Sequence, residues 1–153
     1  MPVQKLKDFL DADKVKYVAV RYSQAFTAQE SAASAHIPGK EMAKTVMVKV
    51  DGKMAMAVLP ASARVDFDLL RAAIDAKSAA LASEREFSEM FPGCEPGAMP
   101  PFGNLYGMDV FVSPSLAEDT EIAFNAGSHT ELIRLAYGDY ERLVKPKVVA
   151  FSV

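Results

Sequence analysis

Hydrophobic and polar residues follow one another along this chain in runs that predict short helices and strands. Near the start, apolar residues recur at helical spacing and would share one face of a helix: Val3, Leu6, Phe9 and Leu10. The next run, Lys16–Arg21, alternates as a short strand does. Thr27–Glu30 (TAQE) has the form of a capping box and would open an alanine-rich helix that ends near Pro38.

Two β-rich runs in the middle of the chain predict a hairpin. Thr45–Val50 and Lys53–Leu59 are separated by Asp51-Gly52. Aspartate and glycine tolerate the positive φ angles of a type I′ turn, so this dipeptide favours a tight antiparallel connection between the two strands.

Two further helices are predicted after the hairpin. Asp66 would open a helix whose apolar face carries Phe67, Leu70 and Ile74. Ser83–Glu86 is a second capping box, and the apolar stripe behind it is expected to pack in the core: Phe87, Met90 and Phe91.

The second half of the chain combines a long loop with short elements. Pro92–Gly107 is rich in proline and glycine, and a stretch this long without regular structure is usually functional. The expected strands are Asp109–Val112, Glu121–Phe124 and Lys147–Ser152, the expected helix is Tyr137–Val144, and Thr130–Ala136 fits either pattern. Because these elements alternate without a regular βαβ rhythm, we predict an α+β fold with a mixed central β-sheet and surrounding helices.

Size and charge restrict the class of protein. A chain of 153 residues, 50% of them hydrophobic, is expected to form one domain over residues 1–153. No apolar run approaches the roughly 18 residues of a membrane span, and the N-terminus lacks the apolar block of a secretory signal, which indicates the cytoplasm. The net charge of −3 argues against binding long stretches of DNA or RNA, but it is compatible with holding the end of a strand.

Cysteine and histidine are scarce. Cys94 is the only cysteine, so an intrachain disulfide or a multi-cysteine metal site cannot form. A zinc site built on His36 and His129 would need carboxylates at ligand spacing, and the sequence has no such cluster. We therefore expect no metal and no cofactor, and we interpret Cys94 as a small loop residue.

Three segments are candidates for chemistry, and each has a plain structural alternative. Gly97–Gly103 (GAMPPFG) is rigid at its prolines and open at its glycines, so it can direct backbone N–H groups at a ligand or simply form a surface turn. Lys44, before Thr45 at a strand start, can hold a phosphate or be a solvated charge. In Gly127–His129 the histidine can be a general base or a structural residue.

Common catalytic motifs are absent from the sequence. There is no G-x-S-x-G elbow for a serine nucleophile, and no acidic residue stands near His129 in a recognisable triad order. No G-x-x-x-x-G-K-[ST] or G-x-G-x-x-G motif follows a strand, so nothing indicates nucleoside triphosphates or dinucleotides.

In their order and spacing these segments resemble the YbaK/EbsC family, which includes free-standing deacylases and the editing domain of bacterial prolyl-tRNA synthetases. The resemblance runs over nearly the whole chain, from Tyr17 to Ser152. The residues that carry it are Ala43–Val46 (AKTV), Val58–Ala61 (VLPA), Arg64–Asp66 (RVD), Phe91–Gly103 (FPGCEPGAMPPFG) and Phe124–His129 (FNAGSH).

The resemblance implies a partly barrel-like sheet and hydrolysis of the ester that joins a mischarged amino acid to the 3′-terminal adenosine of tRNA. It assigns Lys44 to holding the tRNA end and the G-x-x-x-P loop, Gly97–Pro101, to the reacting centre. Gly127 and His129 would shape the amino-acid pocket and place water. The implied catalytic set is Lys44, Gly97, Pro101 and Gly127, and the implied substrate-binding set includes Thr45, Phe102, Gly103, Ser128 and His129.

Two departures from the family pattern bear on the substrate. Ser113-Pro114 stands where family members often have an aspartate before Ser-Leu, and a histidine common near the end of the first strand is missing from Arg21–Phe26. We expect proline tRNA that carries a small wrong amino acid, such as alanine, cysteine or 2-aminobutyrate. By their positions, three residues would set the pocket size: Tyr22, Phe26 and Met47.

The expected mechanism uses positioning rather than a nucleophilic side chain. An aminoacyl ester is already activated, so backbone donors aimed at the oxyanion can suffice, with water or a substrate group attacking. Lys40, Lys44 and Lys49 would contact the few phosphates of the tRNA 3′ acceptor end. Prolyl-tRNA synthetase or an elongation factor would be transient partners. The alternative is a non-catalytic module that binds an aminoacyl-tRNA end or a small ligand.

Overall fold

The hairpin at Asp51-Gly52 forms the centre of the fold. β2 (Ala43–Val50) and β3 (Lys53–Pro60) pair antiparallel along their whole length. The φ angles of Asp51 and Gly52 are 50° and 82°, so both residues have the positive φ of the expected type I′ turn. The predicted hairpin is confirmed.

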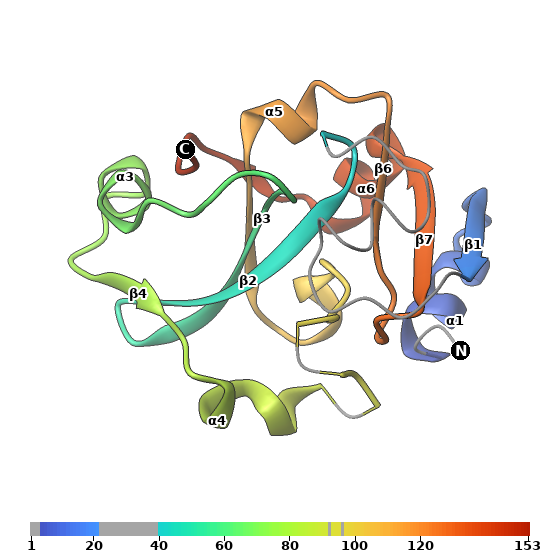
Figure 1. Cartoon of the computed structure of the whole chain (residues 1–153), viewed down its shortest axis with the longest axis horizontal. Coiled ribbons are helices and arrows are strands. Elements are labelled where there is room, and N and C mark those ends of the chain that lie inside the picture. Colours follow the sequence, from blue (N-terminus) through green and yellow to red (C-terminus); the bar gives the residue numbers. More distant parts are fainter. Residues whose placement is uncertain (1–3, 22–39, 92, 96) are drawn as a thin grey trace.

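The computed structural model describes residues 4–21, 40–91, 93–95 and 97–153 (Figure 1). The capping box and helix expected over residues 27–38 lie outside the described residues, and so do Val3, Tyr22 and Phe26.

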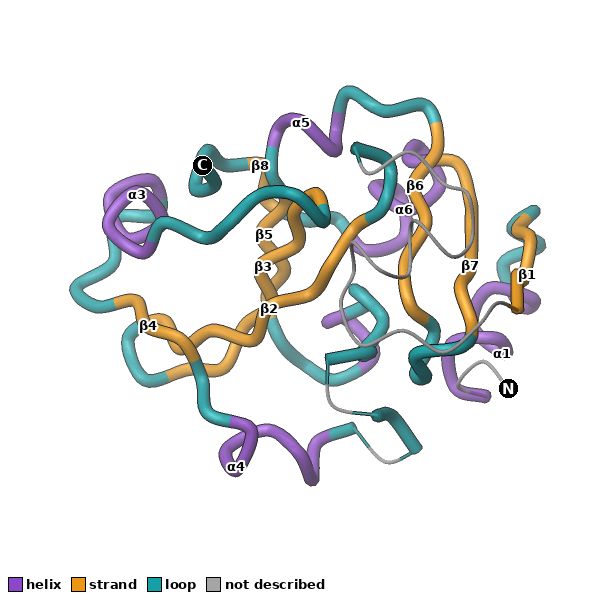
Figure 2. The backbone as a smooth tube through the Cα atoms, in the orientation of Figure 1, coloured by secondary structure: helices purple, strands orange, loops and turns teal. Residues whose placement is uncertain are grey.

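A five-stranded sheet is built around the hairpin in the order β4-β2-β3-β5-β8 (Figure 2). β4 (Ala79–Leu81) pairs antiparallel with β2. On the other side, β5 (Asp109–Val112) pairs parallel with β3, and β8 (Lys147–Val148) pairs parallel with β5.

A second sheet, of three antiparallel strands, stands beside the first in the order β1-β7-β6. Its strands are β1 (Tyr17–Arg21), β6 (Glu121–Asn125) and β7 (Glu131–Ala136). A parallel bridge between Met42 and Ala123 joins β6 to the chain just before β2. The mixed α+β class is confirmed, whereas no sheet among the described residues is closed, so the barrel-like detail is not confirmed.

Five short helices and two 3₁₀ turns surround the sheets in the described part of the chain. The helices are α1 (Gln4–Ala12), α3 (Phe67–Ala73), α4 (Glu84–Phe87), α5 (Pro114–Ala117) and α6 (Tyr137–Val144), and the turns are η1 (Ser88–Met90) and η2 (Gly103–Leu105). Both predicted helix starts are found. The Asp66 carboxylate accepts the Leu69 N–H at 3.0 Å, and the Ser83 N–H donates to the Glu86 carboxylate at 3.0 Å.

The apolar residues divide between the two faces of β2 and β3. One face contributes Met47 and Met56 to the main core. This core also contains buried residues of α1, β6, β7 and α6: Leu6, Leu10, Phe124, Ile133 and Tyr140. The opposite face packs with α3 and the end of the chain: Val48, Leu59, Leu70, Phe111 and Phe151. This division follows from the alternation of side chains along a strand.

Several details differ from the sequence-based expectations. Thr130–Ala136, which fitted either pattern, is strand β7 over 131–136. The last strand is shorter than expected: β8 ends at Val148, the Val149 N–H still donates to the Val112 carbonyl of β5 at 3.1 Å, and Ser152 forms a bridge with Val65 instead. Behind the second capping box, Phe91 is buried in the main core and Phe87 packs against it, as expected. Met90, in η1 after the four-residue α4, is 37% exposed instead.

Candidate active site

The Gly/Pro loop and the turn after β6 are joined through Gly127. Its N–H donates to the carbonyl of Ala98 at 2.8 Å, and its own carbonyl accepts the N–H of Glu95 at 2.7 Å. A third bond, from the Ala98 N–H to the Glu95 carbonyl at 3.0 Å, closes the loop on itself. Two segments that the sequence singled out separately therefore form one backbone unit.

His129 lies beside the other glycine of this unit, Gly97. A Cβ atom built on Gly97 would stand 3.5 Å from His129 Cε1 and 3.8 Å from Nε2. Gly97 is exposed and has a φ of 83°, a conformation that a side chain disfavours, whereas His129 is buried. The structure thus brings Gly97, Gly127 and His129 together, with the imidazole on the side of Gly97 where a Cβ atom would point.

The two glycines differ in what their N–H groups can do. The Gly127 N–H is already donated to Ala98, so it holds the two segments together. The exposed Gly97 N–H makes no hydrogen bond to another described residue. Of these two backbone donors, only the Gly97 N–H is open to an incoming oxyanion.

Asn125 is part of the site, and the sequence reasoning did not single it out. It is the last residue of β6, is buried, and donates from its side-chain Nδ2 to the Ser128 carbonyl at 3.1 Å. The Ser128 hydroxyl in turn lies 3.2 Å from the Thr130 hydroxyl. An asparagine at the end of an apolar strand, followed by Ala-Gly, was the signal in the sequence.

The C-terminal half of the Gly/Pro loop is anchored in the core. The Pro101 carbonyl accepts the buried Tyr140 hydroxyl at 2.8 Å. Phe102 is fully buried between Phe124 and Tyr140, with ring centroids 5.4 Å away on each side. Pro101 and Phe102 therefore lie inside the molecule and fix where the loop emerges.

Gly103, the next residue of the loop, is also packed in the core, and the space around it requires a glycine. A Cβ atom on it would stand 2.6 Å from Val110 Cγ2 and 2.8 Å from the Met108 carbonyl oxygen. Only a residue without a side chain fits there, so packing alone accounts for this glycine.

Lys44 lies near the join between the two sheets. It is in β2, two residues after the parallel Met42–Ala123 bridge, and by the alternation of side chains it is on the same face of β2 as Val48. The Lys44 ammonium makes no hydrogen bond or ion pair with another described residue. Burial, and secondarily the Arg64 guanidinium, lowers the pKa of Lys44 from its ordinary value of 10.5.

Thr45 and Met47 lie on the other face of β2 from Lys44, because side chains alternate along a strand. Met47 is buried in the main core, and Thr45 is half-buried. Tyr22 and Phe26, the other residues expected to set the pocket size, lie outside the described residues.

The two other lysines expected at the tRNA end already have acidic neighbours. Lys49 forms an ion pair with Glu86, with Nζ 2.7 Å from Oε2. Lys40 borders a polar hollow of about 340 Å³ whose other lining residues are Glu41, Glu118, Asp119, Thr120, Glu121 and Arg134. Lys44, unlike Lys49, forms no ion pair with another described residue.

Cys94 lies in the Gly/Pro loop but is a poor nucleophile. Burial raises the pKa of its thiol, and a hydrogen bond with Tyr106 offsets this only in part. A thiol whose pKa is raised is mostly protonated at neutral pH, and the thiolate is the reactive form.

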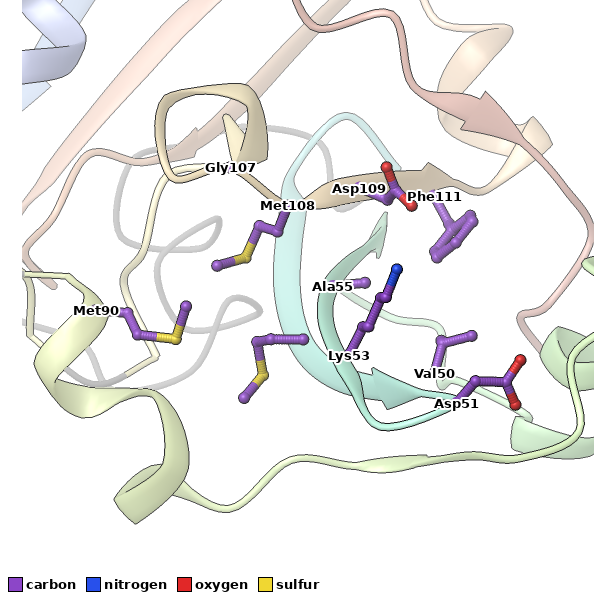
Figure 3. A pocket seen from close by; sticks show the side chains of 10 residues that line it. Val50, Asp51, Lys53, Ala55, Met90, Gly107, Met108, Asp109 and Phe111 are labelled. Carbon is purple, nitrogen blue, oxygen red and sulfur yellow. The ribbon is translucent and has the colours of Figure 1, made fainter.

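A larger hollow, of about 620 Å³, lies at the far end of the hairpin (Figure 3). Its walls carry three methionines, Met54, Met90 and Met108, and the charged residues Asp51, Lys53 and Asp109. None of the predicted site residues lines it. In the part of the chain that the structure describes, no group of three or more His, Cys, Asp or Glu residues is arranged to hold a metal ion, and no helix is long and apolar enough to cross a bilayer.

Comparison with known proteins decides the family. A model of the aminoacyl-tRNA editing domain matches residues 23–143, which contain Lys44 and both glycine segments. The chain belongs to the aminoacyl-tRNA editing domain family. The resemblance found in the sequence is confirmed.

A curated relative in this family is the multifunctional Ser/Thr-tRNA deacylase ProXp-y of Escherichia coli (strain K12). It is 36% identical over 114 residues, which cover 71% of this chain and 68% of the relative. The family match together with this relative confirms the predicted enzyme class, an aminoacyl-tRNA hydrolase. Aminoacyl-tRNA is accordingly the partner of this editing domain.

Solved structures agree on the fold. A putative trans-editing enzyme for prolyl-tRNA synthetase superposes with a TM-score of 0.82 at 17% identity, covering 98% of this chain and 96% of that one. The hypothetical protein APE2540 superposes with a TM-score of 0.85 at 18% identity, covering 97% and 99% of the two chains.

Proposed function

We propose that this editing domain acts in trans, in the cytoplasm, on tRNA that carries a small wrong amino acid and hydrolyses its ester. The observation that carries the proposal is the backbone unit in which Gly127 bonds to both Ala98 and Glu95 while His129 lies beside Gly97. Such a unit holds a glycine N–H at a fixed place, and a fixed donor stabilises a developing oxyanion better than a mobile one.

In this mechanism the protein supplies position and donors. Water, oriented by the protein or by a hydroxyl group of the substrate, attacks the ester carbonyl and loses a proton, and the bond from the carbonyl carbon to the ribose oxygen breaks. The ribose oxygen takes up a proton and leaves as the tRNA hydroxyl, and the amino acid is released with the oxygen of water in its carboxyl group. The Gly97 N–H is the proposed donor to the oxyanion, since the Gly127 N–H is held by Ala98.

Lys44 is the proposed anchor for the terminal phosphate of the tRNA. Its ammonium has no carboxylate partner among the described residues, and Arg64 adds a second positive charge nearby. Two neighbouring cations attract a phosphodiester, and the partial burial of Lys44 strengthens that attraction.

The amino acid to be removed is the finer part of the proposal. The E. coli relative acts on Ser/Thr-tRNA by its name, which makes serine and threonine the first candidates here. The sequence resemblance adds proline tRNA carrying alanine, cysteine or 2-aminobutyrate, and prolyl-tRNA synthetase or an elongation factor as transient partners. The buried alanines beside the paired loops, Ala98 and Ala126, are in keeping with a small side chain.

The test is a deacylation panel on the purified protein. Its substrates are seryl-, threonyl-, alanyl- and cysteinyl-tRNA, each on its own tRNA and on proline tRNA, with correctly charged prolyl-tRNA as the control. We expect at least one of the small amino acids to be released faster than proline. Saturable tRNA binding without release of any amino acid would support the alternative, a non-catalytic binding module.

A further inference from the structure

A buried amide stands directly before the turn that carries Gly127 and His129. Asn125 ends β6 and is 7% exposed, and the residue before it, Phe124, is part of the main core. Burying an amide is costly unless it is hydrogen-bonded. One of its bonds runs from Nδ2 to the Ser128 carbonyl at 3.1 Å, across the turn itself.

This bond acts on a turn whose two ends are already fixed. The Ala126 N–H donates to the Glu131 carbonyl at 3.1 Å, which closes the turn at its base. Inside the turn Gly127 has a φ of 102°, so its peptide groups face outward to the Gly/Pro loop. The Asn125 amide therefore adds a bond across the turn, from its base to the residue after Gly127.

We propose that Asn125 is a positioning residue for the deacylation reaction, which acts through Gly127 and His129 and does not touch the substrate. This inference rests on the proposed function. If the Ser128 carbonyl loses this donor, the turn loses the bond that crosses it, and its shift displaces both contacts with the Gly/Pro loop together. A misplacement of about 1 Å at a reacting centre can lower the rate by about a hundredfold.

Aspartate is the discriminating substitution, because it keeps the shape of asparagine and removes the donor. Asn125→Asp places a carboxylate oxygen against the Ser128 carbonyl oxygen, where two acceptors repel. A matched control exists in Asn104→Asp, the same change at an exposed asparagine in η2. Any general effect of added negative charge would appear in both variants.

The first readout is steady-state deacylation of the best substrate from the panel, together with the thermal unfolding midpoint. We expect Asn125→Asp to lower kcat at least about tenfold with KM within about threefold, as for a group that acts in the transition state. A kcat close to the wild-type value, or a loss in KM alone, overturns the inference. If Asn125→Asp does not fold, Asn125→Ser is measured by the same criteria.

The second readout does not depend on turnover. Amide hydrogen exchange at the Gly127 N–H, followed by NMR, should accelerate at least about tenfold in Asn125→Asp, while β7 amides keep their protection. Unchanged protection at Gly127 overturns the inference whatever the activity. An inactive wild-type protein, by contrast, counts against the proposed function and leaves this second test in place.

Discussion

The imidazole of His129 lies over the backbone of Gly97, with Cε1 3.5 Å from the point that a Cβ atom of residue 97 would occupy. This is an ordinary contact distance, so the space would accept a methyl group. The φ angle of 83° nevertheless disfavours any residue with a side chain, because an L-residue is strained in that region. Backbone conformation, rather than space, is what requires glycine beneath the histidine.

Gly97→Ala should therefore impair the reaction more than the fold. The left-handed conformation costs a residue with a side chain about 1–2 kcal/mol, which an exposed loop relieves by changing shape. We expect kcat/KM to fall at least about tenfold and the unfolding midpoint to fall by only a few degrees. Gly107→Ala is the control, since Gly107 also has a positive φ, 70°, but nothing within 4 Å. Equal activity losses in the two variants would contradict the role given to Gly97.

Gly103→Ala should act in the opposite way, on stability first. Its Cβ atom would overlap Val110 Cγ2 at 2.6 Å and the Met108 carbonyl oxygen at 2.8 Å. Overpacking of this kind typically costs about 1–3 kcal/mol, which chemical denaturation will measure. Gly138→Ala in α6, where nothing lies within 4 Å, should instead stabilise the protein by about 0.5–1 kcal/mol. A Gly103→Ala variant as stable as the wild type would contradict the packing argument.

The lowered pKa of Lys44 predicts how the KM for aminoacyl-tRNA depends on pH. Burial, and then the Arg64 charge, lowers the pKa of Lys44 in the folded protein below the ordinary 10.5, so the ammonium is lost at a lower pH than in an exposed lysine. The KM for aminoacyl-tRNA should rise with pH before 10.5 is reached. Arg64→Met, which removes the like charge, should move this rise to higher pH. A KM that stays flat up to pH 10.5 would argue against Lys44 as the phosphate anchor.

The lowered pKa of Lys44 also determines how the free energy of unfolding changes with pH. Between the folded pKa and 10.5 the unfolded chain binds more protons than the folded one, so the free energy of unfolding rises with pH in this window. Lys44→Met keeps the length of the side chain and should abolish the rise. It should not destabilise the protein at neutral pH, whereas it should weaken tRNA binding about tenfold, as expected for losing one bond to a charged group. Lower stability at neutral pH would contradict this account.

Glu86 should make the protein sensitive to acid. Its hydrogen bond with Lys49, supported by the Ser83 N–H and hydroxyl, lowers the pKa of Glu86 from 4.5 to about 2. A lowered carboxyl pKa stabilises the fold above the ordinary pKa, and this contribution is lost as the pH falls from about 5 toward about 2. The unfolding midpoints of wild type and Glu86→Gln should differ at pH 6 and converge in this window. Glu84→Gln, on the same short helix, should show no such convergence.

Local structure followed from the sequence wherever neighbouring residues determine it. Asp51-Gly52 fixed its own turn, and Asp66 and Ser83 fixed the starts of α3 and α4. The resemblance located the two glycine segments, and the structure joined them through Gly127.

What depends on distant pairing was not predictable in the same way. β4 is three residues long and exists because it pairs with β2, and the last strand is short because Ser152 pairs with Val65. Phe102 and Gly103 belong to a matching motif, but only the packed core shows that Tyr140 and Val110 surround them. Asn125 was missed for the same reason, since its partner carbonyl faces it only when the turn is formed.

Cys94, the one cysteine of the chain, can report on the conformation of the Gly/Pro loop. It lies one residue before Glu95, which bonds to Gly127, and its half-buried thiol has a raised pKa. An alkylating reagent should therefore react slowly while the two segments are joined and faster once they separate. The rate of labelling at this native position measures how often the Gly/Pro loop separates from the turn after β6, without any engineered probe.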